Sequence, residues 1–193
     1  LMKRCFLVVI DSLGVGEAPD AALYGDLGSN TLANVSKAVG GVNLPNMEKL
    51  GFGKFTNVLN MNDTGIATVG RLSEDSVGND STTGHWELAG LTTKTEFKIF
   101  ENGFPKDLIQ NIEKEANCQF IGNRHASGTE IIEELGNQHL ETGDLILYTS
   151  GDSVFQIAAH NKVCSIEKLY EICKISRKYC NQYNIGRVIA RPF

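Results

Sequence analysis

The sequence has few cysteines and no long hydrophobic run, and each of these shortages excludes a class of protein. Its 193 residues include five cysteines, and none of them forms a C-x-x-C pair. An odd number of widely spaced cysteines argues against a disulfide framework or a zinc site and favours buried thiols in a reducing cytoplasm. No apolar stretch approaches the roughly 18 residues that a membrane-spanning helix needs. The apolar stretch near the start ends at Asp11, too early for the core of a signal peptide. We therefore expect a cytoplasmic protein with no membrane partner.

Positive charge is also scarce. The chain has 18 lysines and arginines against 23 acidic residues, a formal net charge of −5. A nucleic-acid-binding surface requires a basic patch, so no nucleic-acid partner is expected. Phosphate chemistry is not excluded, because a bound metal ion can supply positive charge locally. The sequence contains no Walker loop, no G-x-G-x-x-G and no H-E-x-x-H, so neither a nucleotide cofactor nor a helical zinc site is indicated. Each of the four histidines is expected to be a surface or packing residue.

Hydrophobic patterning predicts an alternation of strands and helices, which indicates an α/β or α+β fold. The continuous apolar run at 5–10 is typical of a buried parallel strand. Ser127 and Glu130 have the spacing of a capping box, and Gly136 is expected to end the helix that follows. Further strands are expected at 66–72, 119–121, 145–149, 154–159 and 188–190, and helices at 29–39, 45–50, 85–89, 105–116, 127–135 and 165–180.

Three polar segments could carry chemistry. Asp11 follows the first expected strand, and ligands of open α/β sheets gather beyond the carboxyl ends of strands. A carboxylate there suits a hard cation such as Mg²⁺ or Mn²⁺, although an aspartate that only satisfies its own turn fits equally well. The segment 148–154 could bind sugar hydroxyls or phosphate oxygens, or it could be a turn whose serines and aspartate bond their own backbone.

The remaining polar segment, 78–87, reads Gly-Asn-Asp-Ser-Thr-Thr-Gly-His-Trp-Glu. Three consecutive hydroxyl groups precede an expected helix, where backbone N–H groups and the helix dipole favour negative charge. A hydroxyl in this position could act as a nucleophile toward phosphorus. A plain helix cap with spare threonines explains the same residues. The residues alone therefore indicate an α/β protein that could handle phosphate.

Seven stretches, taken in order, resemble the phosphopentomutases of the alkaline phosphatase superfamily. They are residues 6–21, 25–29, 82–87, 126–131, 148–154, 156–160 and 186–193. The resemblance implies an α/β fold with an alkaline-phosphatase-like core, formed in part by residues 1–95, and an inserted α+β cap domain formed by residues 96–193. It also implies a protein of about twice this length, so the rest of the cap and the C-terminal part of the core would be missing.

The resemblance also implies roles for particular residues. Asp11 matches a ligand of one of two Mn²⁺ ions, and Ser81 matches the phosphate-accepting residue beside the metals, which is usually threonine in the family. Thr82 and Thr83 remain alternative acceptors, and Asn79 replaces a common lysine. Positions that match the ribose-phosphate site are Ser150, Asp152, Arg187 and Ile189, with Arg191 as a weaker candidate and Gly151 where the family often has alanine.

The implied function is the interconversion of ribose 1-phosphate (or deoxyribose 1-phosphate) and ribose 5-phosphate through a phosphoenzyme, in nucleoside salvage. Glucose 1,6-bisphosphate would be the activator, and small-molecule pentose phosphates would be the binding partners. Because most metal ligands of the family lie in the C-terminal half, we expect this chain alone to be an inactive fragment. The alternatives are a cofactor-independent phosphoglycerate mutase or phosphatase of the same superfamily, or a non-catalytic phosphosugar-binding module.

Overall fold

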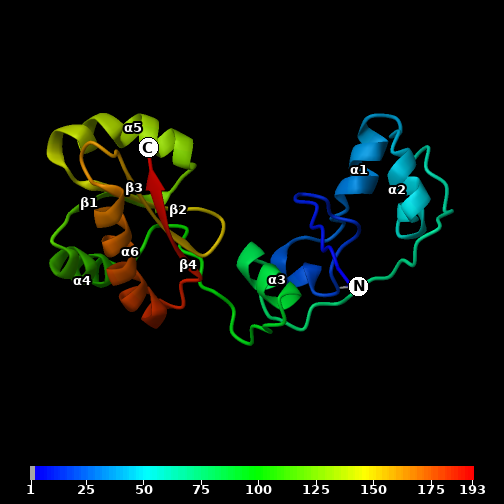
Figure 1. The fold of residues 1–193 in the computed structure, drawn as a ribbon, viewed down its shortest axis with the longest axis horizontal. Coiled ribbons are helices and arrows are strands. Elements are labelled where there is room, and N and C mark those ends of the chain that lie inside the picture. Colours follow the sequence, from blue (N-terminus) through cyan, green and yellow to red (C-terminus); the bar gives the residue numbers. More distant parts are fainter. Residues whose placement is uncertain (1–2) are drawn as a thin grey trace. The chain divides into compact units, whose positions relative to one another are not determined.

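The computed structural model describes residues 3–193, which divide into two units (Figure 1). The first unit ends at Ser73, and the second covers Glu74–Phe193. Helix α3 (Ser81–Leu88) therefore belongs to the second unit. The division expected near residue 95 concerns the domains of the family, and it stays a prediction.

The described part of the first unit consists of short helices and loops. Its elements are η1 (Ala21–Tyr24), α1 (Thr31–Ala38), α2 (Pro45–Leu50) and η2 (Phe52–Lys54). The side chain of Asn30 caps α1 by accepting a hydrogen bond from the N–H of Ala33 at 3.1 Å. Gly51 ends α2 with a φ of +92°, a backbone conformation that favours glycine. The helices expected at 29–39 and 45–50 are thus confirmed.

The strands expected at 5–10 and 66–72 do not form. Residues 3–10 carry no assigned secondary structure, and the side chains of Phe6 and Val8 are about four-fifths exposed, at 82% and 79%. Ile66 and Leu72 are exposed to an even greater extent. A buried parallel strand needs a hydrogen-bonded neighbour on each edge and a covered face on each side. No described residue of the first unit provides such a neighbour, so the apolar pattern is present without the sheet that would bury it.

The second unit contains one mixed four-stranded sheet with the order β1-β2-β3-β4 (Figure 1). β1 pairs with β2 in parallel, β2 with β3 antiparallel, and β3 with β4 in parallel. Two strand–helix–strand crossovers build it, one through α5 and the other through α6. The elements after α3 are α4 (Lys106–Ala116), β1 (Phe120–His125), α5 (Gly128–Thr142), β2 (Leu145–Thr149), β3 (Val154–Ala159), α6 (Ile166–Cys180), η3 (Asn181–Tyr183) and β4 (Arg187–Pro192).

The two faces of the sheet are covered by different helices. Alternation along β2 sends Leu145 and Leu147 to one face and Ile146 and Tyr148 to the other. The first face packs against α4 and α6, and the second packs against α5. Because β3 runs antiparallel to β2, two crossovers of the usual right-handed sense place their helices on opposite faces. The result is a three-layer unit with α5 on one side of the sheet.

Several predicted elements of this unit are confirmed, and three details are wrong. Strands 145–149 and 154–159 have the expected bounds. α3 begins at Ser81, four residues before the expected start, because the Asp80 side chain caps it. α5 continues through Gly136 and ends at Gly143, and Ser127 makes no capping hydrogen bond, so the predicted capping box does not form. An interior glycine costs only about 1 kcal/mol, which the packing of the rest of the helix outweighs.

Helix α3 connects to the rest of the second unit through aromatic packing. The indole of Trp86 meets the ring of Phe97 edge-on, with ring centroids 5.4 Å apart. Phe97 in turn lies against Gly186, where an added Cβ would come within 3.2 Å of the ring. Glu87 holds the chain before the helix by accepting hydrogen bonds from the N–H groups of Asp75 and Ser76. The aromatic contacts tie the last turn of α3 to the loop that precedes β4.

One of the four histidines, His139, is a buried packing residue. His139 is fully buried, and its Nε2 accepts a hydrogen bond from the N–H of His160 at 2.8 Å. A backbone N–H can only donate, so Nε2 carries no proton and Nδ1 donates to the carbonyl of Asp144 at 2.6 Å. The imidazole therefore joins the end of α5 to the loop after β3.

Two negative findings apply to the part of the chain that the structure describes. No helix among residues 3–193 is both long enough and apolar enough to cross a bilayer. All five cysteines are free thiols; the expectation that they are buried is confirmed for Cys164 and Cys180 and is wrong for the exposed Cys5.

Candidate functional site

The corner between β2 and β3 is the polar segment that the sequence singled out at 148–154. The chain reverses over residues 150–153, between the buried Thr149 and the buried Val154. Ser153 anchors this corner: its hydroxyl donates to the carbonyl of Lys98 at 2.7 Å and accepts from the N–H of Gly186 at 3.0 Å. Ser153 also bonds the start of β4, because its carbonyl accepts from the N–H of Arg187. The corner and the first residue of β4 are thereby held together.

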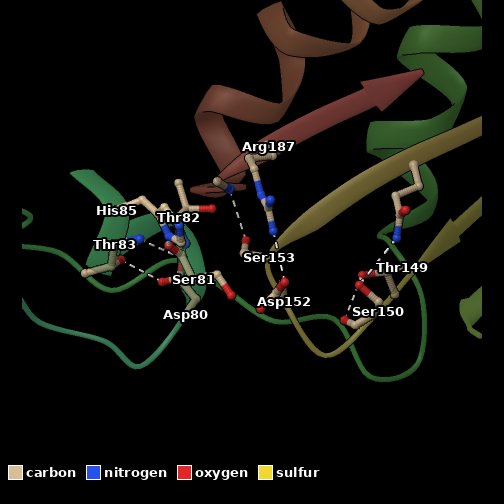
Figure 2. Close-up of polar contacts among 12 residues, drawn as sticks. Asp80, Ser81, Thr82, Thr83, His85, Thr149, Ser150, Asp152, Ser153 and Arg187 are labelled. Carbon is tan, nitrogen blue, oxygen red and sulfur yellow. Dashed lines mark hydrogen bonds and ion pairs between the residues drawn. The ribbon is translucent and has the colours of Figure 1, made fainter. Parts of the chain in front are cut away.

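Asp152 and Arg187 face each other across this junction (Figure 2). The guanidinium Nη2 donates to Oδ2 of Asp152 at 2.9 Å, and both side chains are more than one-third exposed. The Nε of Arg187 is buried without a hydrogen-bond partner. Because a guanidinium carries five N–H donors, the ion pair with one carboxylate oxygen leaves further donors for a ligand.

Ser150 and Ile189 complete the set predicted for this region. The Ser150 hydroxyl accepts a long hydrogen bond of 3.4 Å from the side-chain amide of Gln156. Ile189 is half-buried on β4, in register with Gln156 of β3. The structure therefore places Ser150, Asp152, Arg187 and Ile189 along one junction of β2, β3 and β4.

The start of α3 forms a second polar group in the same unit (Figure 2). Oδ1 of Asp80 accepts from the N–H groups of Thr82 and Thr83 at 2.9 and 3.1 Å, and Oδ2 accepts from the Thr83 hydroxyl at 2.7 Å. Thr82 and Thr83 are buried, whereas Ser81 is exposed. Among the three consecutive hydroxyl residues, the one at the first helical position is thus the one that solvent and ligands reach.

The backbone of Ser81 is bonded within α3, and an acidic side chain lies near the other end of the same helix. The carbonyl of Ser81 accepts a hydrogen bond from Nδ1 of His85 at 2.7 Å, one helical turn later. Hydrogen bonds from the side chain of Ser76 and the N–H of Asp75 lower the pKa of the Glu87 carboxyl. The Ser81 hydroxyl itself makes no hydrogen bond to Asp152 or Arg187 in the described structure.

Asp11 lies in the other unit. It occupies a turn in which the N–H of Leu13 bonds the carbonyl of Ile10 at 3.4 Å, and its side chain is exposed. Residues 3–193 contain no group of three or more histidine, cysteine, aspartate or glutamate side chains arranged to hold a metal ion. The described residues therefore do not assemble a two-metal centre by themselves.

Sequence reasoning missed two residues that shape these groups. Asp80 precedes the hydroxyl run directly, and an aspartate before a helix is a common cap, so its role could have been inferred. The role of Ser153 could not, because its partners Lys98 and Gly186 are 55 and 33 residues away.

Comparison with known proteins relates the whole chain to one family of enzymes, although no family model matches it. It is 53% identical to the phosphopentomutase of Carboxydothermus hydrogenoformans over 100% of this chain and 50% of that protein. It is 51% identical to the phosphopentomutase of Kosmotoga olearia and 53% identical to that of Thermotoga petrophila, over 98% of this chain and 50% of each relative. The chain is thus a homologue of phosphopentomutases and spans about half of their length, which is consistent with their N-terminal half.

Proposed function

We propose that this chain is the N-terminal half of a phosphopentomutase, which interconverts ribose 1-phosphate or deoxyribose 1-phosphate with ribose 5-phosphate. The observation that carries the proposal is the identity of about one-half to relatives of that name over the entire chain. The homologues give no support to a phosphoglycerate mutase or a phosphatase. In this proposal, residues 1–95 contribute to an alkaline-phosphatase-like core and residues 96–193 to its inserted cap.

Ser81 is the proposed phosphate acceptor. Its exposure and its place at the first position of α3 support this choice over Thr83, whose hydroxyl is engaged by Asp80. Backbone N–H groups at the helix start and the helix dipole favour the negative charge of a phosphoryl group there. Transfer would break the bond between phosphorus and Oγ of Ser81 and form one to the sugar hydroxyl, whose proton passes to Oγ. Glucose 1,6-bisphosphate would supply the first phosphoryl group.

The corner at 150–153 and β4 are the proposed sugar-phosphate site. Arg187 would use its remaining guanidinium donors for the phosphate that does not react, and Ser150 and Asp152 would bond sugar hydroxyls. The half-buried Ile189 would supply an apolar contact to the ribose. Holding the distal phosphate in place orients the sugar and converts a bimolecular step into an effectively unimolecular one.

The proposed cofactor is a pair of Mn²⁺ ions, which would neutralise charge on the transferred group. The described residues offer Asp11 and the Ser81 oxygen, and these are too few for such a site. The remaining ligands would have to come from the half of the relatives' length that this chain does not cover. The missing half would also provide the strands that residues 5–10 and 66–72 require.

Mass spectrometry tests this function most directly. The protein is incubated with Mn²⁺ and glucose 1,6-bisphosphate, and the intact mass and the modified peptide are measured. A gain of one phosphoryl group on the peptide that contains Ser81, its loss in Ser81→Ala, and pentose phosphate turnover by the complete protein would support the proposal. Turnover by a complete Ser81→Ala protein would refute the role of Ser81. Binding of ribose 5-phosphate without any turnover by the complete protein would favour a binding module instead.

A further inference from the structure

Helix α5 begins without a side-chain cap. Its N-cap residue is Ser127, whose side chain makes no capping hydrogen bond, and the first backbone bond of the helix runs from the N–H of Ile131 to the carbonyl of Ser127. The N–H groups at the start of a 15-residue helix carry partial positive charge and need acceptors. The uncapped end is therefore suited to an anion, but this alone does not define a site.

A buried phenol points at the same place. Tyr148 is 1% exposed, and its O–H has no acceptor among the described residues, because the guanidinium of Arg191 beside it can only donate. The phenol oxygen lies 2.7 Å from the point that a Cβ on Gly128 would occupy. Buried tyrosine hydroxyls usually find a partner, so an unpaired one beside an uncapped helix end indicates a missing acceptor.

A cation completes the group. Nη2 of Arg191 lies 2.9 Å from the same Cβ point on Gly128, and this exposed arginine forms no ion pair with a carboxylate in the described chain. Burial raises the pKa of the Tyr148 phenol, and the charge of Arg191 acts in the opposite direction. A positive side chain beside the positive end of a helix is unfavourable unless an anion lies between them.

We propose that Gly128, Tyr148 and Arg191 form a binding site for a phosphate group, either inorganic phosphate or a phosphate monoester. Because Gly128 has no side chain, the phenol of Tyr148 and the guanidinium of Arg191 can both approach the first turn of α5. The donors differ in kind and direction, namely helix N–H groups, a phenol and a guanidinium, and this mixture suits the several oxygens of a tetrahedral anion.

The site is separate from the corner occupied by Arg187. Arg191 stands four residues further along β4, about 13 Å at the usual rise of a strand, and Arg187 is already paired with Asp152. The inference does not rest on the proposed catalytic function, and it assigns Arg191, the weaker candidate for the ribose-phosphate site, to the start of α5 instead.

Phosphate titration followed by NMR tests the site. The ¹⁵N-labelled chain is titrated with inorganic phosphate while the amide signals of Gly128 and Thr129 are followed, with sodium chloride at matched ionic strength as the reference. We expect a saturable shift with phosphate only. Arg191→Gln should weaken the affinity by about tenfold or more, because a charge-assisted hydrogen bond is lost. Tyr148→Phe should weaken it less, and Arg187→Gln should leave it unchanged.

Three results would overturn the proposal. The first is the absence of a saturable shift at Gly128, or an equal shift with chloride. The second is unchanged affinity in Arg191→Gln. Because Arg191 is exposed, this variant should stay folded, and the rest of its amide spectrum checks that a loss of affinity is not a loss of the fold. The third is loss of the Gly128 shift in Arg187→Gln, which would assign the anion to the corner between β2 and β3.

Discussion

Arg187, the first residue of β4, donates from Nη2 to Oδ2 of Asp152 in the corner between β2 and β3, at 2.9 Å. The pair joins two segments that are 35 residues apart. Beside it, the hydroxyl of Ser153 makes hydrogen bonds with the backbone of Lys98 and of Gly186. An ion pair that is more than one-third exposed contributes little to stability, so its main effect is to orient the guanidinium.

We expect Asp152→Asn to weaken ribose 5-phosphate binding several-fold while changing the free energy of unfolding by less than about 1 kcal/mol. The amide keeps the size of the side chain but removes the charge that orients Arg187. Calorimetric titration and urea denaturation measure the two effects. Asp75→Asn is the matched control, because it removes an exposed ion pair of similar length, the 2.8 Å pair with Lys94, away from the corner. Equal losses of affinity in both variants would show a general charge effect.

Removing the buried imidazole of His139 should destabilise the second unit strongly. His139→Ala leaves the N–H of His160 and the carbonyl of Asp144 without partners and opens a cavity. Each unsatisfied buried group costs about 1–3 kcal/mol, so we expect a total loss of about 3–5 kcal/mol in urea denaturation. His125→Ala, at an exposed position, should stay within about 0.5 kcal/mol of the wild type. A small effect at His139 would mean that water replaces both hydrogen bonds.

The cap of α3 predicts a local effect on the proposed acceptor. Asp80→Ala removes the acceptor of two backbone N–H groups and should cost about 1 kcal/mol of helix stability. Amide hydrogen exchange at Thr82 and Thr83 should then accelerate about fivefold, which corresponds to that energy. Asp80→Asn should restore slow exchange because asparagine caps equally well. Fast exchange in both variants would show that the charge of Asp80, rather than its cap, holds the helix start.

The contact between α4 and α6 gives a pH dependence. Glu115 of α4 accepts hydrogen bonds from Lys178 and Tyr179 of α6, and these lower the pKa of Glu115 below 4.5 and raise the pKa values of Lys178 and Tyr179. A lowered carboxyl pKa contributes stability above the unfolded value, and this stability is lost as the pH falls through the folded value. The raised pKa values of Lys178 and Tyr179 act at the alkaline end, where the contribution is lost as each group deprotonates.

Glu115→Gln should therefore be less stable than the wild type at neutral pH, and the difference should shrink as the pH falls below 4.5. Urea denaturation at a series of pH values measures it, and high salt should reduce the difference at neutral pH because the groups are exposed. Glu167→Gln, in the exposed first turn of α6, is the control. A difference that stays constant down to pH 3 would contradict the assignment.

The contrast between β2 and the stretch at 5–10 shows what sequence patterns can predict. Both are continuous apolar runs, yet Leu145–Thr149 is buried between two paired strands and residues 5–10 are exposed. An apolar run expresses a requirement for burial, but it does not contain the partner that supplies it. The neighbours of β2 lie in the same unit, whereas the described part of the first unit offers no strand to residues 5–10.

The candidate site divides in a similar way. Asp152 and Arg187 could be predicted as members of one site only through the resemblance, because their proximity depends on the crossover through α6. The exposure of Ser81 relative to Thr82 and Thr83 follows from the cap at Asp80, a local feature that the sequence does contain. Ser127 and Glu130 show the opposite case: they have the spacing of a capping box, yet the Ser127 side chain makes no capping hydrogen bond in the structure.

The exposed stretch at residues 3–10 contains Cys5, whose thiol can be labelled with a reagent in solution. Burial raises the pKa of Cys118 and Cys173 to about 11 and of Cys180 to about 12, and it also raises the pKa of Cys164. Since the thiolate is the reactive form, a maleimide dye at neutral pH should label Cys5 ahead of the other four. A single fluorophore on that residue would then report, by a change in emission, the moment at which another polypeptide covers the stretch.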